Sequence, residues 1–119
     1  MSFNYFSYAR GDCLSLHSDE RTDRYDDPRR DSITRRVALA TYFHDAWDVN
    51  WGGELITYEK KATGGNDEAY AITNCISPDP GSLVLFTVPH EHRLFRIDPP
   101  AGDNKRLSIA GWFMTDHGQ

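Results

Sequence analysis

A histidine and an aspartate two residues apart, His17 and Asp19, are the first side chains along the chain that could perform chemistry together. On a β-strand, side chains two apart point to the same face, so both could bind one metal ion. An imidazole, a carboxylate and one distant histidine cover three neighbouring positions of an octahedral ion and leave three open, which suits iron(II). Taken alone, the pattern is more typical of a surface loop than of a metal site, so its interpretation depends on the motifs that accompany it.

Two candidates for the distant histidine, His90 and His92, stand in the segment Pro89-His90-Glu91-His92. They are two residues apart, so on a regular strand both would face the same side. Periodicity therefore does not choose between them.

The elements that would have to position these side chains are short strands. Alternating or aromatic segments separated by turn signals indicate strands at residues 3–8, 13–16, 37–43, 54–58, 83–88, 93–97 and 106–115. No segment keeps a helical period beyond one or two turns. One domain over residues 1–119 is expected, all-β and mainly antiparallel with few or no helices, and a jelly roll is its natural closed form.

The composition narrows the class of partner. The net charge is −5 and the arginines are mixed with acidic residues, so nucleic acid, which needs a clustered positive surface, is not expected. No stretch approaches the ~20 apolar residues that span a bilayer, and the first ten residues lack a signal-peptide pattern. Cys13 and Cys75 show neither metal spacing nor a disulfide framework, so we expect a cytoplasmic protein with free thiols.

One segment, residues 20–34, does not belong to the core, because nine of its fifteen residues are charged. The simplest interpretation is a solvated loop. A second interpretation is a lid, because the segment begins directly after Asp19 and long charged loops beside a site often close over it.

Six motifs occur in a fixed order along the chain. They are Tyr8-Ala9-Arg10-Gly11-Asp12-Cys13-Leu14-Ser15-Leu16-His17-Ser18-Asp19, Tyr42-Phe43-His44-Asp45-Ala46-Trp47, Gly52-Gly53-Glu54-Leu55, Ser77-Pro78-Asp79-Pro80-Gly81-Ser82-Leu83-Val84-Leu85-Phe86, Pro89-His90-Glu91-His92 and Arg106-Leu107-Ser108-Ile109-Ala110-Gly111-Trp112-Phe113. In that order the chain resembles the prolyl-4-hydroxylase-like branch of the 2-oxoglutarate/iron(II) dioxygenases, from residue 5 to residue 113. Each motif is weak alone, but six in the right order are specific.

The resemblance implies a double-stranded β-helix, a jelly roll whose open end holds the iron. His17 and Asp19 match the first two metal ligands. His90 matches the distal histidine of the family's His-Glu-Val block and is the expected third ligand. His92 matches a position that is normally apolar, so we expect it to line the pocket.

Arg106 matches the basic residue that pairs with the far carboxylate of 2-oxoglutarate. Its planar guanidinium can donate two parallel hydrogen bonds to a carboxylate, which a lysine cannot. The resemblance adds Ser108, Tyr42 and Tyr8 to the cosubstrate site, and Trp112 to the pocket wall.

The implied activity is hydroxylation of an unactivated C–H bond with Fe(II), 2-oxoglutarate and O2, releasing succinate and carbon dioxide. The bound metal supplies the oxidising chemistry that side chains lack, so no catalytic side chain is expected beyond its ligands. The expected substrate is a prolyl or other amino-acid residue of a peptide or protein, with small molecules left open. The alternatives are a non-enzymatic, cupin-like metal-binding module and an iron enzyme with another cosubstrate. Arg106-x-Ser108 favours the dioxygenase, because a metal-binding module needs no carboxylate clamp.

The chain departs from the family pattern in several places. His44 replaces an asparagine, His92 replaces a valine, and residues 98–105 lengthen the path to Arg106. Helices that usually precede the first core strand have no counterpart ahead of residues 3–8. The apolar sheet surface that such helices would cover leads us to expect a homodimer formed through this strand or its sheet.

Overall fold

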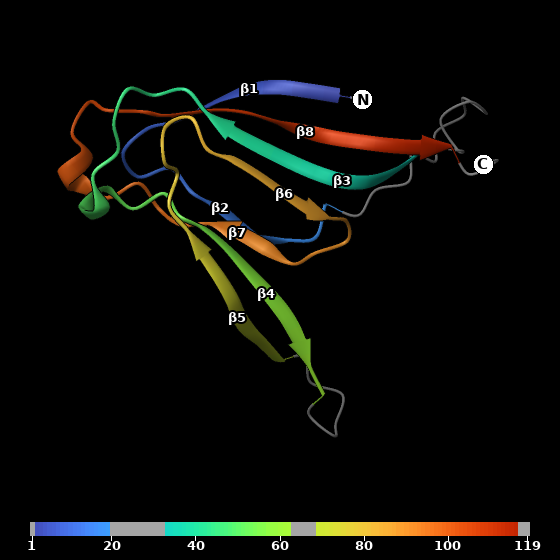
Figure 1. Ribbon diagram of the computed structural model, residues 1–119. Helices are drawn as coiled ribbons and strands as arrows, with labels where there is room; N and C mark the ends of the chain where they lie inside the picture. The colour runs from blue at the N-terminus through green and yellow to red at the C-terminus, as the bar shows by residue number, and fades with distance from the viewer. Residues whose placement is uncertain (1, 20–32, 63–68, 117–119) are drawn as a thin grey trace.

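The computed structural model describes residues 2–19, 33–62 and 69–116, which form two four-stranded antiparallel sheets (Figure 1). In chain order the strands are β1 (Ser2–Tyr8), β2 (Leu14–His17), β3 (Ile33–Tyr42), β4 (Leu55–Lys61), β5 (Ala69–Ile76), β6 (Leu83–Thr87), β7 (His92–Leu94) and β8 (Arg106–Asp116). The first sheet has the order β1-β8-β3-β6 and the second β2-β7-β4-β5. The predicted all-β, antiparallel architecture is confirmed.

Helical structure in the described part of the chain is limited to two 3-10 turns, η1 (Val49–Trp51) and η2 (Pro99–Ala101). Neither turn has the length and apolar character that a membrane-spanning helix requires. Both turns lie at one end of the molecule, where they contact each other (Figure 1).

The first sheet forms one wall of the molecule's interior. Its longest ladder joins β3 to β8, from Ile33 opposite Asp116 to Tyr42 opposite Ser108. Because side chains alternate along a strand, one face of this ladder carries Tyr42 and Ser108 inward. The same face carries small side chains at Ala38, Ala40 and Ala110, which leave the space between the sheets only partly filled and so open a cavity.

The second sheet is shorter and more exposed. In it β7 lies between β2 and β4, and His17 of β2 stands directly opposite His92 of β7. The β4–β5 hairpin extends away from the body of the molecule (Figure 1). Strand β5 was not among the strands predicted from the sequence.

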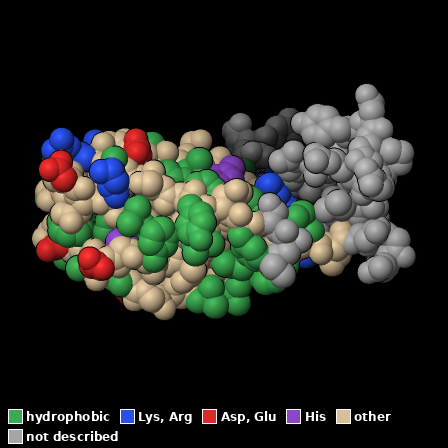
Figure 2. All heavy atoms as spheres, turned by 90° about the horizontal axis from the view of Figure 1, so that it is seen from above, with side chains coloured by type: hydrophobic (Ala, Val, Ile, Leu, Met, Phe, Trp, Pro, Cys, Tyr) green, Lys and Arg blue, Asp and Glu red, His purple; other side chains and the backbone are tan. Residues whose placement is uncertain are grey.

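The outer face of the first sheet is apolar. Tyr5 is 78% exposed, and Leu83 and Leu85 of β6 are 61% and 56% exposed. Figure 2, which views the molecule from the side of β1, shows apolar side chains gathered on this face. Among the described residues β1 pairs with β8 and its other edge has no partner strand.

Most of the predicted charged loop, residues 20–34, lies outside the described residues. Its last two residues already belong to β3, which begins at Ile33. The interpretation of residues 20–32 as a solvated loop or a lid stays a prediction.

Candidate metal and cosubstrate site

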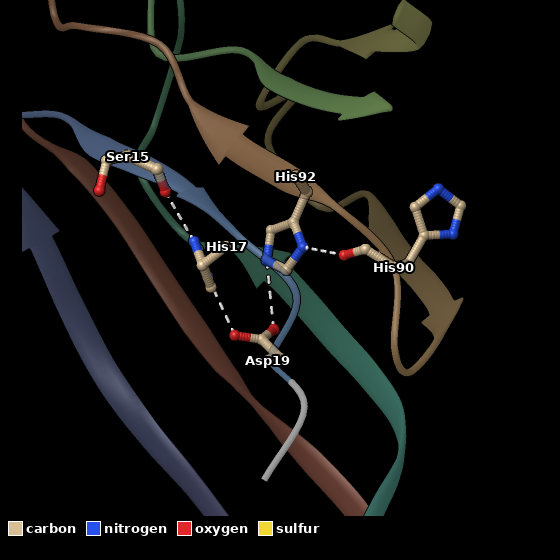
Figure 3. Close-up of polar contacts among 5 residues, drawn as sticks. All are labelled: Ser15, His17, Asp19, His90 and His92. Atoms are coloured by element: carbon tan, nitrogen blue, oxygen red, sulfur yellow. Dashed lines mark hydrogen bonds and ion pairs between the residues drawn. The ribbon is translucent and has the colours of Figure 1, made fainter. Parts of the chain in front are cut away.

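Three side chains with metal-ligating atoms meet where β2 and β7 lie side by side (Figure 3). Nε2 of His17 lies 2.9 Å from Oδ1 of Asp19, and Nε2 of His92 lies 3.2 Å from Oδ2 of Asp19. All three ligand atoms lie within 4.8 Å of one another. Strand β2 ends at His17, and a left-handed φ of 60° at Asp19 places its carboxylate between the two rings. The two residues thus meet through a turn, not through a continuous strand.

Main-chain carbonyls hold both imidazole rings in one orientation. Nδ1 of His17 lies 2.7 Å from the carbonyl oxygen of Ser15, and Nδ1 of His92 lies 2.7 Å from that of His90 (Figure 3). A carbonyl oxygen can only accept, so each Nδ1 carries a hydrogen and donates it. With Nδ1–H held in this way, Nε2 of each ring faces Asp19. It donates an N–H to the carboxylate while no metal is bound, and on losing that proton it offers a lone pair to a metal, as metal-binding histidines do.

The two histidines and Asp19 shift the pKa values of the site in favour of its charged forms. Burial opposes ionisation of Asp19, but hydrogen bonds from His17 and His92 outweigh it, so the pKa of the carboxyl lies well below its usual range. The hydrogen bond to Asp19 raises the pKa of His17, against the opposing effect of burial. Asp19 is consequently a carboxylate at any ordinary pH.

His90, the histidine preferred from the sequence, does not reach this group; the structure places His92 there instead. The His90 ring points away from Asp19 and lies edge-on to Phe86, with 6.0 Å between ring centroids (Figure 3). Its Nε2 is buried without a hydrogen-bond partner in the described part of the chain. The physical reason is the pairing of β2 with β7, which sets His92, and not His90, opposite His17. His90 contributes its main-chain carbonyl to the His92 ring.

The group fits an iron ion. Nitrogen and oxygen ligands bind transition metals at about 2.1 Å, so neighbouring ligands of an octahedral ion lie about 3 Å apart. The two nitrogen–oxygen distances to Asp19 have this size. Two imidazoles and one carboxylate are also the donor set of non-haem iron(II) centres.

Arg106 starts β8 and is 3% exposed. Its Nε donates to the carbonyl oxygen of Gly53 at 2.9 Å, and its Nη2 donates to the hydroxyl of Tyr42 at 3.1 Å. Gly53 has φ of 75°, and a Cβ there would lie 2.8 Å from Cδ1 of Ile97 and 3.2 Å from Cδ of Arg106. Glycine is therefore what allows the main chain to approach the guanidinium so closely.

The Arg106 charge is buried without an ion pair in the described part of the chain. Among residues 2–19, 33–62 and 69–116, no carboxylate forms an ion pair with it. Burial lowers the pKa of Arg106 and raises those of Tyr8 and Tyr42, whose rings lie 5.7 and 4.8 Å from its guanidinium carbon. A buried cation that lacks an anion is costly, so the arrangement is suited to an anionic ligand.

One cavity of about 280 Å³ joins the metal-ligating group to the arginine. Its wall includes all the site residues predicted from the sequence except His90, namely Tyr8, His17, Asp19, Tyr42, His92, Arg106, Ser108 and Trp112. The volume is close to the ~300 Å³ at which small-ligand pockets begin. Most of the other residues in the wall are apolar, including Phe6, Leu14, Leu55, Phe86 and Leu94.

The sequence did not predict Arg35 as part of this wall. Its guanidinium carbon lies 3.5 Å from the centroid of the Trp112 ring. Strict alternation back from Tyr42 would turn Arg36 inward, but the β3–β8 register shifts between Arg35 and Val37. Such a bulge exchanges the faces of the residues before it and leaves no local signal in the sequence.

These features can be compared with known proteins. The sequence profile of the 2OG-Fe(II) oxygenase superfamily matches residues 3–114 of the chain. The chain belongs to this superfamily. Fe(II), 2-oxoglutarate and O2 are therefore its expected cofactor and cosubstrates, and the His17–Asp19–His92 group fits the iron.

A solved relative agrees with this membership. The crystal structure of a Pseudomonas putida prolyl-4-hydroxylase is 26% identical, with a TM-score of 0.61 over 93% of this chain and 49% of that one. The chain thus shares its jelly-roll fold with this relative and spans about half of its length. A comparison with curated proteins gave no match.

Proposed function

We propose that this chain carries the active site of a hydroxylase that oxidises an unactivated C–H bond, coupled to conversion of 2-oxoglutarate and O2 to succinate and carbon dioxide. The observation that supports this most directly is the shared cavity. It contains a His-Asp-His group at one place and a buried arginine without an acidic partner at another. A cupin-like binding module would need the first and not the second.

In this proposal His17, Asp19 and His92 would hold the iron, a donor set that would leave it free to bind cosubstrate and oxygen. When bound, the iron supplies the oxidising chemistry that no side chain can provide. The main-chain carbonyls of Ser15 and His90 keep both Nε2 lone pairs available to the metal.

Arg106 would bind the far carboxylate of 2-oxoglutarate. Its Nε and Nη2 already donate to Gly53 and Tyr42, so these two groups hold the guanidinium in place before the cosubstrate enters. The hydroxyls of Tyr42 and Ser108 line the same cavity and are available to that carboxylate. The apolar wall excludes water and so strengthens each of these interactions.

The substrate class that we propose is a prolyl or other amino-acid residue of a peptide or protein. The support is the similarity to an enzyme named as a prolyl-4-hydroxylase and the aromatic side chains in the cavity wall, among them Phe6, Phe86 and Trp112, which suit a compact apolar ring. Small-molecule substrates are the alternative, and peptide and free amino-acid libraries would distinguish the two.

Anaerobic titration tests the core of the proposal. The protein is loaded with Fe(II) and then titrated with 2-oxoglutarate, and we expect a weak visible charge-transfer band that saturates near one equivalent. On admission of O2, succinate should form. Iron binding with neither the band nor succinate would favour the metal-binding module. Oxygen consumption without 2-oxoglutarate would favour an iron enzyme with another cosubstrate.

A further inference from the structure

His44, which stands where the family pattern has asparagine, is buried and uses both of its ring nitrogens. Nε2 lies 2.6 Å from the carbonyl oxygen of Pro78, and the main-chain N–H of Leu107 donates to Nδ1 at 3.0 Å. Because a main-chain N–H can only donate, Nδ1 carries no hydrogen, and Nε2 donates its own to Pro78. The ring is thus held as one neutral tautomer between two segments distant in the sequence.

The bond to Leu107 extends the β3–β8 ladder past its last residue pair. The ladder ends with Tyr42 opposite Ser108, and the N–H of Phe43 still donates to the carbonyl of Leu107. Beyond that point the imidazole of His44 supplies the acceptor that the β3 main chain no longer offers. Leu107 directly follows Arg106, so this bond fixes the main chain from which the arginine side chain extends.

A second connection leads from His44 to the other end of the Arg106 side chain. The His44 ring packs against Trp47, with 4.8 Å between centroids. Nε1 of Trp47 donates to the carbonyl oxygen of Gly52 at 2.8 Å, and the next carbonyl, that of Gly53, accepts from Nε of Arg106. The main chain at Arg106 and the carbonyl that orients its guanidinium therefore both depend on groups that contact His44.

We propose that His44 is a positioning residue for the 2-oxoglutarate clamp, acting through Leu107 and through Trp47 on Arg106. The role rests on the proposed function, in which Arg106 binds the cosubstrate. His44 is absent from the wall of the cavity, so its effect must pass through these neighbours. The acceptor at Nδ1 is the part of the ring that matters most, because it bonds the residue next to Arg106.

Two substitutions test the hydrogen bonds of the two ring nitrogens separately. In His44→Asn the side-chain oxygen can take the place of Nδ1 and keep the acceptor for Leu107. In His44→Gln the longer amide can take the place of Nε2, which keeps the donor to Pro78 and loses the acceptor. His44→Phe keeps the packing on Trp47 and loses both. Asp45→Asn, at the exposed neighbour, is the matched control.

Two readouts are measured for each variant. The first is the affinity of the Fe(II)-loaded protein for 2-oxoglutarate under anaerobic conditions, and the second is the Arg106 Nε–H resonance in cosubstrate-free protein. A lost hydrogen bond that leaves a buried donor costs enough to weaken binding by about tenfold. We expect this weakening in His44→Gln and His44→Phe, with a shifted Arg106 resonance and unchanged iron affinity. His44→Asn should stay within about threefold of wild type, as should Asp45→Asn.

The proposal is overturned if His44→Gln loses thermal stability while its 2-oxoglutarate affinity and Arg106 resonance match wild type, since His44 would then be purely structural. It is also overturned if Asn and Gln have equal effects on both readouts. Failure of the wild type to bind 2-oxoglutarate would refute the proposed function instead. In that case the Arg106 resonance still decides whether His44 positions the arginine.

Discussion

The Nε2 atom of His92 lies 3.2 Å from Oδ2 of Asp19, while the other carboxylate oxygen receives His17 at 2.9 Å. One carboxylate thus joins two imidazoles from neighbouring strands. Without a metal, each Nε2 can bond to this carboxylate only by carrying a proton. Metal binding at these atoms must therefore displace protons.

The identity of the third ligand is testable with a matched pair of histidines. His92→Ala should weaken Fe(II) binding by about 100-fold or more, since even changes behind the ligands cost about 10- to 100-fold. His90→Ala should bind iron nearly as wild type does, because its ring points away from Asp19 and its main-chain carbonyl persists. Anaerobic calorimetric titration measures both. Loss of iron in His90→Ala with retention in His92→Ala would reverse the assignment.

The raised pKa of His17 predicts opposite pH dependences for the metal-free fold and for metal binding. A group whose pKa is raised in the folded state stabilises the fold below its usual value of 6.5, and this stability is lost as pH rises through the raised pKa. Metal affinity should rise over the same window, because fewer protons compete for Nε2. Calorimetry of chelator-treated protein and titration with Mn(II) from pH 6 to 8 measure the two trends. The difference in Tm between wild type and Asp19→Asn reports the contribution of the His17–Asp19 pair. If that difference grew as the pH rose, a raised pKa of His17 would be contradicted.

Local sequence patterns predicted seven of the eight strands in the described part of the chain, and β5 is the one that they missed. Strand β5 carries four consecutive exposed residues, 72–75, in a hairpin that extends from the body. Its side chains are therefore not constrained to a period of two. Strand β3 was predicted to begin at Val37, but it starts at Ile33 and contains the bulge that turns Arg35 inward.

Most of the site could be predicted because each motif fixes residue types at short spacing, as in His17-x-Asp19 and Arg106-x-Ser108. The structure sets His92 instead of His90 beside Asp19 because of the register between β2 and β7, and local patterns do not give the register of strands more than seventy residues apart. The role proposed for His44 could not be predicted from the sequence either, because its hydrogen-bond partners Pro78 and Leu107 come from two other, distant segments.

If Arg106 binds the far carboxylate of 2-oxoglutarate, substitutions at this end of the cavity should change the affinity for 2-oxoglutarate and leave the affinity for iron unchanged. Arg106→Met, which fills the space without the charge, should weaken 2-oxoglutarate by about 100-fold, because a buried carboxylate would lose a charged, hydrogen-bonded partner. Arg106→Lys should recover part of this loss. Tyr42→Phe should lower the affinity for 2-oxoglutarate by about fivefold, because it removes one hydrogen bond. Iron affinity should be unchanged in all three. Equal 2-oxoglutarate affinity in wild type and Arg106→Met would refute the clamp.

The exposed first sheet predicts association with a second copy of the chain. Strand β1 is an edge among the described residues, and its sequence has neither a charge nor a proline, the features that usually protect an edge from pairing. The outer face of the same sheet is apolar, with Tyr5 exposed on β1 and Leu83 and Leu85 exposed on β6, at the opposite edge. We expect a concentration-dependent dimer in sedimentation velocity, weakened by Tyr5→Lys.

Val49→Lys is the control for this prediction, because Val49 is 85% exposed but lies in η1 and outside this sheet. Both substitutions should change the free energy of unfolding by about 0.5 kcal/mol or less, as is usual at exposed positions. A monomer at every concentration, or equal weakening by the two lysines, would show that this sheet is not the interface.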